Sequence, residues 1–268
     1  MRAAFSKAEI ESEIALRFGS AFQLRQKSPA EILSTGVTEI DALCGGLPRG
    51  GITEFVGPAS SGRTTLLLST LAYATTHDEI CAMVDISDVF VPGLAAAAGV
   101  ILEKLLWIRC ASTVEPAFKA VDLISQAGGF GLIILDMGDV AGKDARRIIS
   151  SWWYRFRRTL ENTLTAMVVI AEESCVRSCA SLSLELKGYP VWSADTVRSS
   201  EVQTSDTEKN MLYEISHPAI NNSWSRLRIN PKPLTHANLL KANSIVVERR
   251  RPVHPGLKEV RFKAIAQA

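Results

Sequence analysis

The chain has 268 residues and a mass of 29.2 kDa, with 47% hydrophobic, 22% charged and 7% aromatic residues. This composition is close to that of average globular proteins, so it excludes wholesale disorder, collagen-like repeats and a coiled coil. Thirty Lys and Arg residues nearly balance 28 Asp and Glu residues, for a net charge of +2. A total so small gives no reason by itself to expect nucleic acid or a membrane surface as a partner.

The cysteines and the uncharged runs indicate the compartment. Five cysteines form no CxxC pair and leave an odd count, so we expect free thiols rather than a disulfide scaffold or a zinc site. No uncharged run is long enough to span a membrane, and the acidic N-terminal residues Glu9, Glu11 and Glu13 are not typical of a signal peptide. We therefore expect a cytoplasmic chain without membrane contact.

The apolar periodicity predicts elements along the whole chain. It predicts a helix over residues 7–18, a short extended segment over 21–24, strands over 52–56, 80–85, 131–136 and 166–171, and helices over 64–75, 117–127 and 144–162. After Ser181 the pattern changes to short alternating strands, which indicates an antiparallel extension. Continuous apolar strands that alternate with helices are typical of a parallel sheet covered on both faces. The predicted fold class is therefore α/β with a mostly parallel central sheet.

The predicted organisation has two parts. An N-terminal arm covers residues 1–32, and a core covers residues 33–268, of which 216–268 form a basic, β-rich end.

The strongest motif is the segment Gly57-Pro58-Ala59-Ser60-Ser61-Gly62-Arg63-Thr64-Thr65, which follows a predicted strand and precedes a predicted helix. In a phosphate-binding loop (P-loop) of this form, the backbone curls so that successive N–H groups point at phosphate oxygens, and the following helix adds its positive end. The candidate nucleotide-binding residues are Gly57, Ser60, Ser61, Gly62, Arg63, Thr64 and Thr65. A coincidental glycine-rich turn is the alternative.

Three residues bear on the chemistry of this loop. Arg63 stands where the motif has lysine, and its longer, forked guanidinium does not reproduce the placement of a compact ammonium between the β- and γ-phosphates. We therefore expect nucleotide binding with impaired hydrolysis. Thr64 and Asp136, which ends an apolar strand, are the candidate magnesium ligands. A helix-capping role beside Gly138 is the alternative for Asp136.

These segments resemble the RecA recombinase family. The matching pieces are Leu33-Ser34-Thr35-Gly36, Ile40-Asp41, Gly45-Gly46-Leu47-Pro48-Arg49-Gly50, the loop itself, Cys81-Ala82-Met83-Val84-Asp85, Pro92 to Val100, the strands that carry Asp136 and Val168–Ala171, and the closing segments Val246-Val247 and Val260-Arg261-Phe262. The resemblance implies a RecA-like P-loop NTPase core that uses ATP and Mg²⁺.

The chain also departs from the RecA pattern. The catalytic glutamate of the family falls at Ser87, and a serine cannot act as that base; the adjacent Asp88 is the candidate replacement. The nucleotide-sensing amide of the family falls near Glu172-Glu173. Both DNA-binding loops of the family are shortened, because only residues 137–143 separate the Asp136 strand from the next helix and Cys179-Ala180-Ser181 follows closely on Glu173. The chain therefore resembles a degenerate RecA paralogue.

Among such paralogues the chain resembles the ImuA family, the RecA-like members of bacterial damage-inducible mutagenesis cassettes. The resemblance implies an accessory role in DNA repair and SOS-induced translesion synthesis. The implied partners are RecA or another RecA-like protomer, a Y-family-like polymerase homologue or an error-prone polymerase, and single-stranded DNA. The resemblance also allows association with the bacterial nucleoid. The alternatives are an active DNA-dependent ATPase of the RecA or KaiC type, and a pure interaction protein that regulates RecA filaments or cell division.

The same resemblance gives the N-terminal arm a role. In RecA a leading helix and strand dock onto the neighbouring subunit, so the candidate docking residues are Phe18, Ala21, Phe22 and Leu24. Packing of this arm on its own core is the alternative.

Basic residues gather near the end of the chain. Residues 224–268 carry ten Lys and Arg against two Glu, a charge of +8, and the preceding 223 residues carry 20 basic and 26 acidic residues, a charge of −6. The candidates for contact with DNA or a partner are Arg226, Arg228, Arg249, Arg250 and Arg251. A solvated β surface is the alternative.

The segment over residues 146–158 mixes arginines with aromatic residues. Helical spacing puts Ile149, Trp152, Trp153 and Phe156 on one face, which favours a core helix with the arginines outside. A surface that stacks nucleic-acid bases is the alternative.

Overall fold

The computed structural model describes residues 31–110, 113–192, 240–252 and 258–265. The predicted helix over residues 7–18 and the extended segment over 21–24 lie outside this part of the chain. So do the docking candidates Phe18, Ala21, Phe22 and Leu24 and the basic candidates Arg226 and Arg228. All of these stay predictions.

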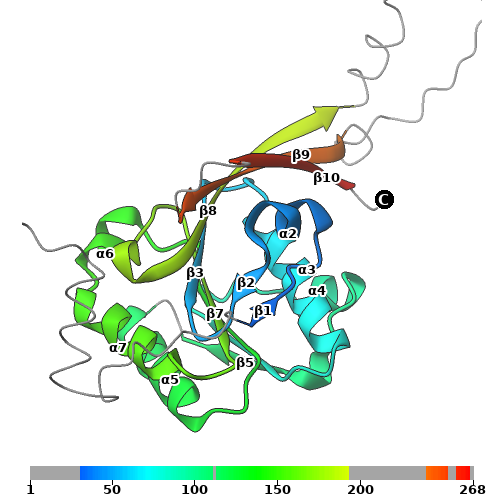
Figure 1. Ribbon diagram of the computed structural model, residues 1–268. Coiled ribbons are helices and arrows are strands. Elements are labelled where there is room, and N and C mark those ends of the chain that lie inside the picture. The colour runs from blue at the N-terminus through cyan, green and yellow to red at the C-terminus, as the bar shows by residue number, and fades with distance from the viewer. Residues whose placement is uncertain (1–30, 111–112, 193–239, 253–257, 266–268) are drawn as a thin grey trace, which may run out of the picture. The chain divides into compact units, whose positions relative to one another are not determined.

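An eight-stranded sheet carries the fold, with the strand order β10-β9-β8-β3-β7-β6-β4-β5 (Figure 1). The parallel strands are β3 (Ile52–Val56), β4 (Cys81–Asp85), β5 (Leu105–Arg109), β6 (Leu132–Met137), β7 (Ala166–Ala171) and β8 (Ala180–Trp192). Beyond β8, the antiparallel strands β9 (Leu240–Arg251) and β10 (Glu259–Ile265) extend the sheet. The predicted α/β class, with a mostly parallel sheet and an antiparallel extension, is confirmed.

Helices cover both faces of the sheet because its central strands are apolar on both sides. On β7, Val168 and Ile170 point into one core and Met167 and Val169 into the other, as the alternation of a strand requires. The first core lies under α2 (Thr38–Cys44), α3 (Arg63–Thr76) and α4 (Pro92–Ala97), and the second lies under α5 (Val114–Ala127), α6 (Gly142–Arg147) and α7 (Ser150–Leu160) (Figure 1).

A small sheet of β1 (Ile32–Leu33) and β2 (Leu47–Pro48) precedes the central sheet, with α2 between its strands. Asp41 of α2 accepts hydrogen bonds from the backbone N–H of Thr35 at 2.9 Å and from the Thr35 hydroxyl at 2.8 Å. The Ser34 hydroxyl donates to the same carboxylate at 2.5 Å. These bonds fix the turn before α2, so the Ser34-Thr35-Gly36 segment has a structural role.

The single helix predicted over residues 144–162 is wrong. The chain forms α6 and α7, and between them Ile148 and Ile149 are extended, with ψ angles of 125° and 126°. As a result Ile149 is 68% exposed, which corrects its predicted place on the core face. Trp153 and Phe156 are buried against Phe118 of α5, as the core interpretation requires.

Two strands differ from the prediction. β8 is one strand of 13 residues rather than a series of short ones, and it pairs in parallel with β3 along its first half. The edge strand β5 was missed, although residues 105–108 form a continuous apolar run. Short 3₁₀ turns, η2 (Leu102–Lys104) and η3 (Arg177–Cys179), precede β5 and β8.

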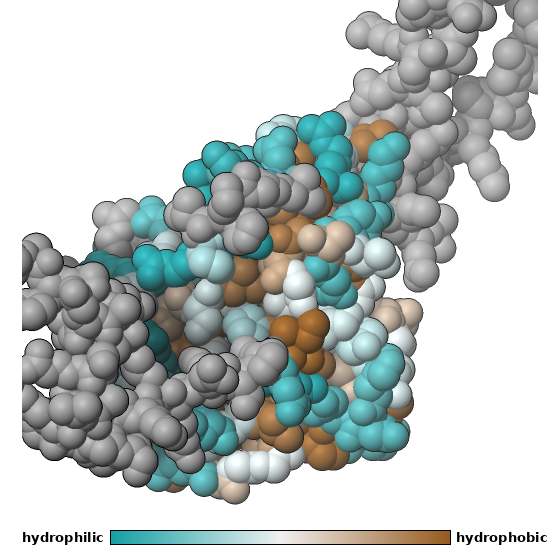
Figure 2. Space-filling model, viewed as in Figure 1, coloured by the Kyte–Doolittle hydropathy of each residue, from teal (hydrophilic) through white to brown (hydrophobic). Residues whose placement is uncertain are grey.

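The visible surface is mixed. Figure 2 shows hydrophobic residues scattered among hydrophilic ones on this face, with mostly hydrophilic residues over β9 and β10. Within the described ranges, no helix has the length and apolar character needed to cross a membrane.

Candidate nucleotide-binding site

The predicted phosphate loop connects β3 to α3, in the strand–loop–helix order that the motif requires. The Gly57 N–H donates to the carbonyl oxygen of Ala171 at 3.2 Å, which anchors the start of the loop on β7. Ser60 and Gly62 have positive φ angles of 61° and 98°, so the backbone turns back on itself before α3. The first turn of a helix has N–H groups without intrahelical partners, so the N-terminal end of α3 beside this turn is a favourable place for an anion.

Strands β8 and β9 form the opposite wall of a cavity at the loop. Asn243 Nδ2 donates to the carbonyl oxygen of Ser60 at 3.3 Å. Gly188 of β8 packs so closely that a Cβ atom there would lie 2.1 Å from the same oxygen. The cavity has a volume of about 760 Å³ and is lined by residues 58–65, 187–190 and 243. A volume of this size is typical of sites that hold a nucleotide-sized ligand.

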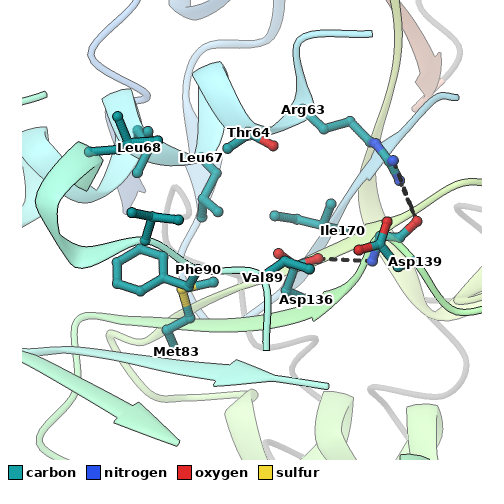
Figure 3. Close-up of a pocket in the computed structure, with 13 residues that line it drawn as sticks. Arg63, Thr64, Leu67, Leu68, Met83, Val89, Phe90, Asp136, Asp139 and Ile170 are labelled. Carbon is teal, nitrogen blue, oxygen red and sulfur yellow. Dashed lines mark hydrogen bonds between the residues drawn. The ribbon is translucent and has the colours of Figure 1, made fainter. Parts of the chain in front are cut away.

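A second, smaller cavity of about 200 Å³ joins three of the candidate residues, Arg63, Thr64 and Asp136 (Figure 3). The Arg63 side chain extends from α3 to the turn after β6, where its Nη1 and Nη2 atoms each lie 3.4 Å from the carbonyl oxygen of Gly138. The fold therefore brings together the loop arginine, the candidate metal-binding hydroxyl and the acidic end of β6, as the sequence predicts.

The Asp136 carboxyl lies in a desolvated environment. Burial raises its pKa to about 6, against the opposing effects of a hydrogen bond from the Gly138 N–H to Oδ1 at 2.8 Å and of the nearby Arg63 charge. The hydrogen bond to Gly138 closes the turn after β6. It does not cap a helix, because α6 begins only at Gly142.

Ser87, at the position of the family's catalytic glutamate, and the candidate base Asp88 lie just after β4. Ser87 is half-buried and Asp88 is exposed. Arg109 of β5 donates two hydrogen bonds to the Asp88 carboxylate, one of them from Nε at 2.5 Å, and these bonds lower the pKa of Asp88. A carboxylate held this way is a weak proton acceptor, so the geometry argues against Asp88 as a base.

Both loops that follow the central strands are short, as predicted. Residues 138–141 connect β6 to α6, and residues 172–176 connect β7 to η3. Glu172 and Glu173 are exposed at the end of β7, and a Cβ atom on Gly142 would lie 3.1 Å from the Glu173 carboxyl carbon.

A buried carboxylate that sequence reasoning missed holds the second of these loops. Glu54 of β3 is 1% exposed and accepts hydrogen bonds from the backbone N–H groups of Cys175 at 2.9 Å and Val176 at 2.7 Å, and from the Ser174 hydroxyl at 2.9 Å. The available signal was a single acidic residue inside a short strand without other charged residues.

The three candidate arginines that the structure describes in the basic end, Arg249, Arg250 and Arg251, differ in their surroundings. Arg250 bonds to Glu185 at 2.6 Å and to Glu248 at 2.9 Å, and the bond with Glu185 raises the pKa of the guanidinium. Arg251 is exposed, whereas Arg249 is partly buried in β9. Charge is therefore partly neutralised at this end of the sheet.

The cysteines give no sign of redox or metal chemistry. All five are free, and burial raises the pKa of Cys81 and of Cys175 to about 12, which makes these thiols poor nucleophiles. In the part of the chain that the structure describes, no group of three or more His, Cys, Asp or Glu side chains is placed to hold a metal ion.

The parallel sheet, its two layers of helices and the loop between β3 and α3 define a P-loop protein with a RecA-type core. The chain belongs to the RecA family, because the family model described as the RecA N-terminal domain matches residues 4–146, more than half of the sequence.

Individual relatives agree with this assignment. The chain is 38% identical over 131 residues to Protein RecA of Ectopseudomonas oleovorans, covering 47% of this chain and 37% of that protein. It is 31% identical over 179 residues to Protein RecA of Leifsonia xyli subsp. xyli, covering 59% and 50%. The chain thus matches half or less of the length of these curated relatives. The crystal structure of the RadB recombinase has the same fold, with a TM-score of 0.53 and 17% identity over 87% of this chain and 96% of that one.

Proposed function

We propose that this chain is a RecA-like accessory protein in DNA repair that binds a nucleotide but hydrolyses it poorly or not at all. The observation that carries the proposal is Arg63, which occupies the lysine position of the P-loop and directs its guanidinium to Gly138 beside Asp136. A forked guanidinium can bind phosphate oxygens, but it does not give the same transition-state contact as a lysine ammonium.

The residues around the reacting phosphate support the same proposal. Ser87 falls where the family has its catalytic glutamate, and Asp88 is engaged by Arg109. Without a base to orient water, nucleotide binding would serve to stabilise a conformation rather than to drive turnover.

The proposed mode of action is contact with partners and DNA in the bacterial cytoplasm, with a role in SOS-induced translesion synthesis beside a polymerase. The short loops 138–141 and 172–176 support an accessory role, since they leave little backbone for DNA contact. The proposed docking partner of the N-terminal arm is a RecA-type protomer. If deletion of residues 1–27 leaves association with RecA unchanged, that part of the proposal is wrong.

ATP binding and turnover, measured on the purified full chain with and without single-stranded DNA, test the proposal. We expect ATP binding without turnover above background. Arg63→Ala should weaken binding at least tenfold, because a charge-assisted hydrogen-bond donor to phosphate is lost. The exposed Arg158→Ala, which removes the same charge from α7, should not.

Two other results would favour the alternatives. DNA-stimulated turnover that Thr64→Ala abolishes would identify an active ATPase and overturn the proposal. Absence of any nucleotide binding would favour an interaction protein with a vestigial loop.

A further inference from the structure

Arg63 is the first residue of α3 and is 8% exposed. The guanidinium donates two hydrogen bonds to the described residues, and both go to the carbonyl oxygen of Gly138, at 3.4 Å each. A guanidinium has five N–H donors in a planar fork, so most of its donors remain for another partner. Figure 3 shows the side chain reaching from the helix to the turn beside Asp136.

The guanidinium and the Asp136 carboxylate flank the same backbone position. A Cβ atom on Gly138 would lie 3.1 Å from Oδ1 of Asp136 and 3.5 and 3.6 Å from Nη1 and Nη2 of Arg63. Thr64 lines the same cavity. A fixed positive charge therefore lies close to the point where the Thr64 hydroxyl and the Asp136 carboxylate would meet a metal ion.

These residues do not fit a magnesium ion. Mg²⁺ requires a nearly octahedral shell of oxygen ligands and gives up its water reluctantly. Oδ1 of Asp136 already accepts the Gly138 N–H at 2.8 Å. A divalent cation between Thr64 and Asp136 would lie beside a guanidinium, which is positively charged and bulkier than an ammonium.

We infer that this P-loop binds its nucleotide as a metal-free polyanion, with the Arg63 guanidinium in the place of Mg²⁺. The inference rests on the proposed nucleotide binding. The ligand class is a nucleoside di- or triphosphate whose terminal phosphate oxygens accept hydrogen bonds from the first turn of α3 and from the forked guanidinium. The Asp136 carboxylate beside the guanidinium adds a negative charge that opposes the bound phosphates.

Equilibrium dialysis of the full chain with labelled ATP, in magnesium buffer and in EDTA, tests the inference. We expect ATP to bind in EDTA at least as tightly as in magnesium. Arg63→Lys keeps the charge and removes the fork, so it should lose about tenfold in affinity in EDTA and recover in magnesium. Thermal unfolding of each variant without nucleotide shows whether it is folded.

The Asp136→Asn variant tests the inference independently. If Arg63 replaces the metal, removal of a negative charge beside the phosphates should tighten ATP binding in EDTA. Wild-type binding that requires magnesium and that Asp136→Asn weakens would overturn the inference and leave the proposed nucleotide binding intact. Absence of binding in both buffers would instead overturn the nucleotide binding itself.

Discussion

Glu54, in the middle of β3, accepts a 2.7 Å hydrogen bond from the backbone N–H of Val176, which lies 122 positions later in the chain. The same carboxylate oxygen accepts the Cys175 N–H. One buried side chain thus ties the strand that leads into the P-loop to the loop that follows β7. The Glu54 side chain therefore couples the position of the P-loop to the path of residues 172–176.

Glu54→Met should lower the free energy of unfolding by about 2–4 kcal/mol, because two backbone donors and the Ser174 hydroxyl lose their acceptor in a buried place. Glu54→Gln keeps one carbonyl oxygen for both N–H groups and should cost about 1 kcal/mol. Urea unfolding measures both values. Equal stability of Glu54→Met and wild type would mean that the desolvation cost of the charge cancels its hydrogen bonds.

Asp136→Asn should change stability in a pH-dependent way. Because the folded pKa is raised to about 6 from 3.8, the folded state holds the proton more tightly, and wild-type stability falls as pH rises through this window. The asparagine has no such penalty, so the variant should be more stable by about 3 kcal/mol above pH 6. The difference should vanish towards pH 4. Thermal melts across this range measure it, and a gain independent of pH would contradict the assigned cause.

Gly188→Ala should destabilise the protein by about 1–3 kcal/mol, because the new methyl group would lie 2.1 Å from the Ser60 carbonyl oxygen and force β8 away from the loop. The displacement should also weaken nucleotide binding. Gly93→Ala in α4 is the matched control, since nothing lies within 4 Å of its Cβ position. That variant should be more stable by about 0.5–1 kcal/mol. Similar effects of the two substitutions on unfolding would show that the close approach of β8 is not required.

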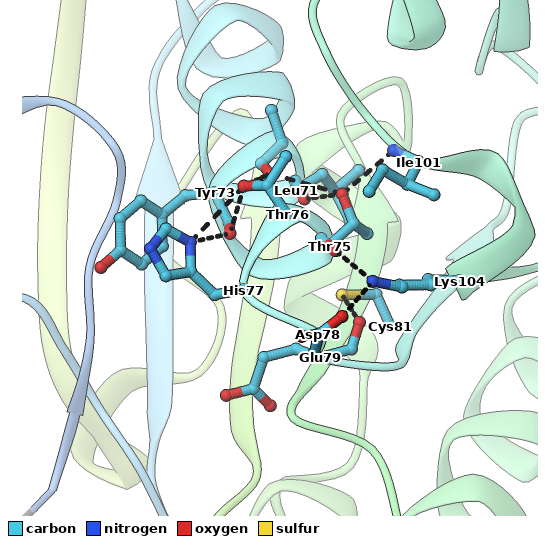
Figure 4. A network of polar contacts seen from close by, with 11 residues as sticks. Leu71, Tyr73, Thr75, Thr76, His77, Asp78, Glu79, Cys81, Ile101 and Lys104 are labelled. Carbon is cyan, nitrogen blue, oxygen red and sulfur yellow. Dashed lines mark hydrogen bonds and ion pairs between the residues drawn. The ribbon is translucent and has the colours of Figure 1, made fainter.

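Lys104→Met should destabilise the end of α3. Lys104 Nζ donates to the carbonyl oxygen of Thr75 at 3.0 Å and to Asp78 at 2.6 Å, so it places a positive charge at the helix C-terminus (Figure 4). Loss of this contact should cost about 0.5–1 kcal/mol in thermal or urea unfolding. Lys119→Met, which removes an exposed i,i+4 pair with Glu115, should change stability less. The reverse order would exclude the capping role of Lys104.

Periodicity placed the central strands because both their faces are buried. β3 and β7 have exactly the predicted bounds, and the loop between β3 and α3 was identified from its glycines and its Arg63-Thr64 end. The break at Ile148 and Ile149 escaped prediction, because an apolar pair without Gly or Pro carries no local sign of a helix end. The edge strand β5 also escaped prediction, although residues 105–108 form an apolar run of four.

By itself the sequence determined the fold class, the P-loop and the departures at Arg63 and Ser87, because these depend on residue type and short spacing. Only the tertiary structure decided which partners the charged side chains have. It paired Asp88 with Arg109, Arg250 with Glu185, and Glu54 with the loop after β7, and it brought Arg63 beside Asp136. Such partners lie tens of residues apart along the chain, and strand order and register, which no local pattern encodes, bring them together.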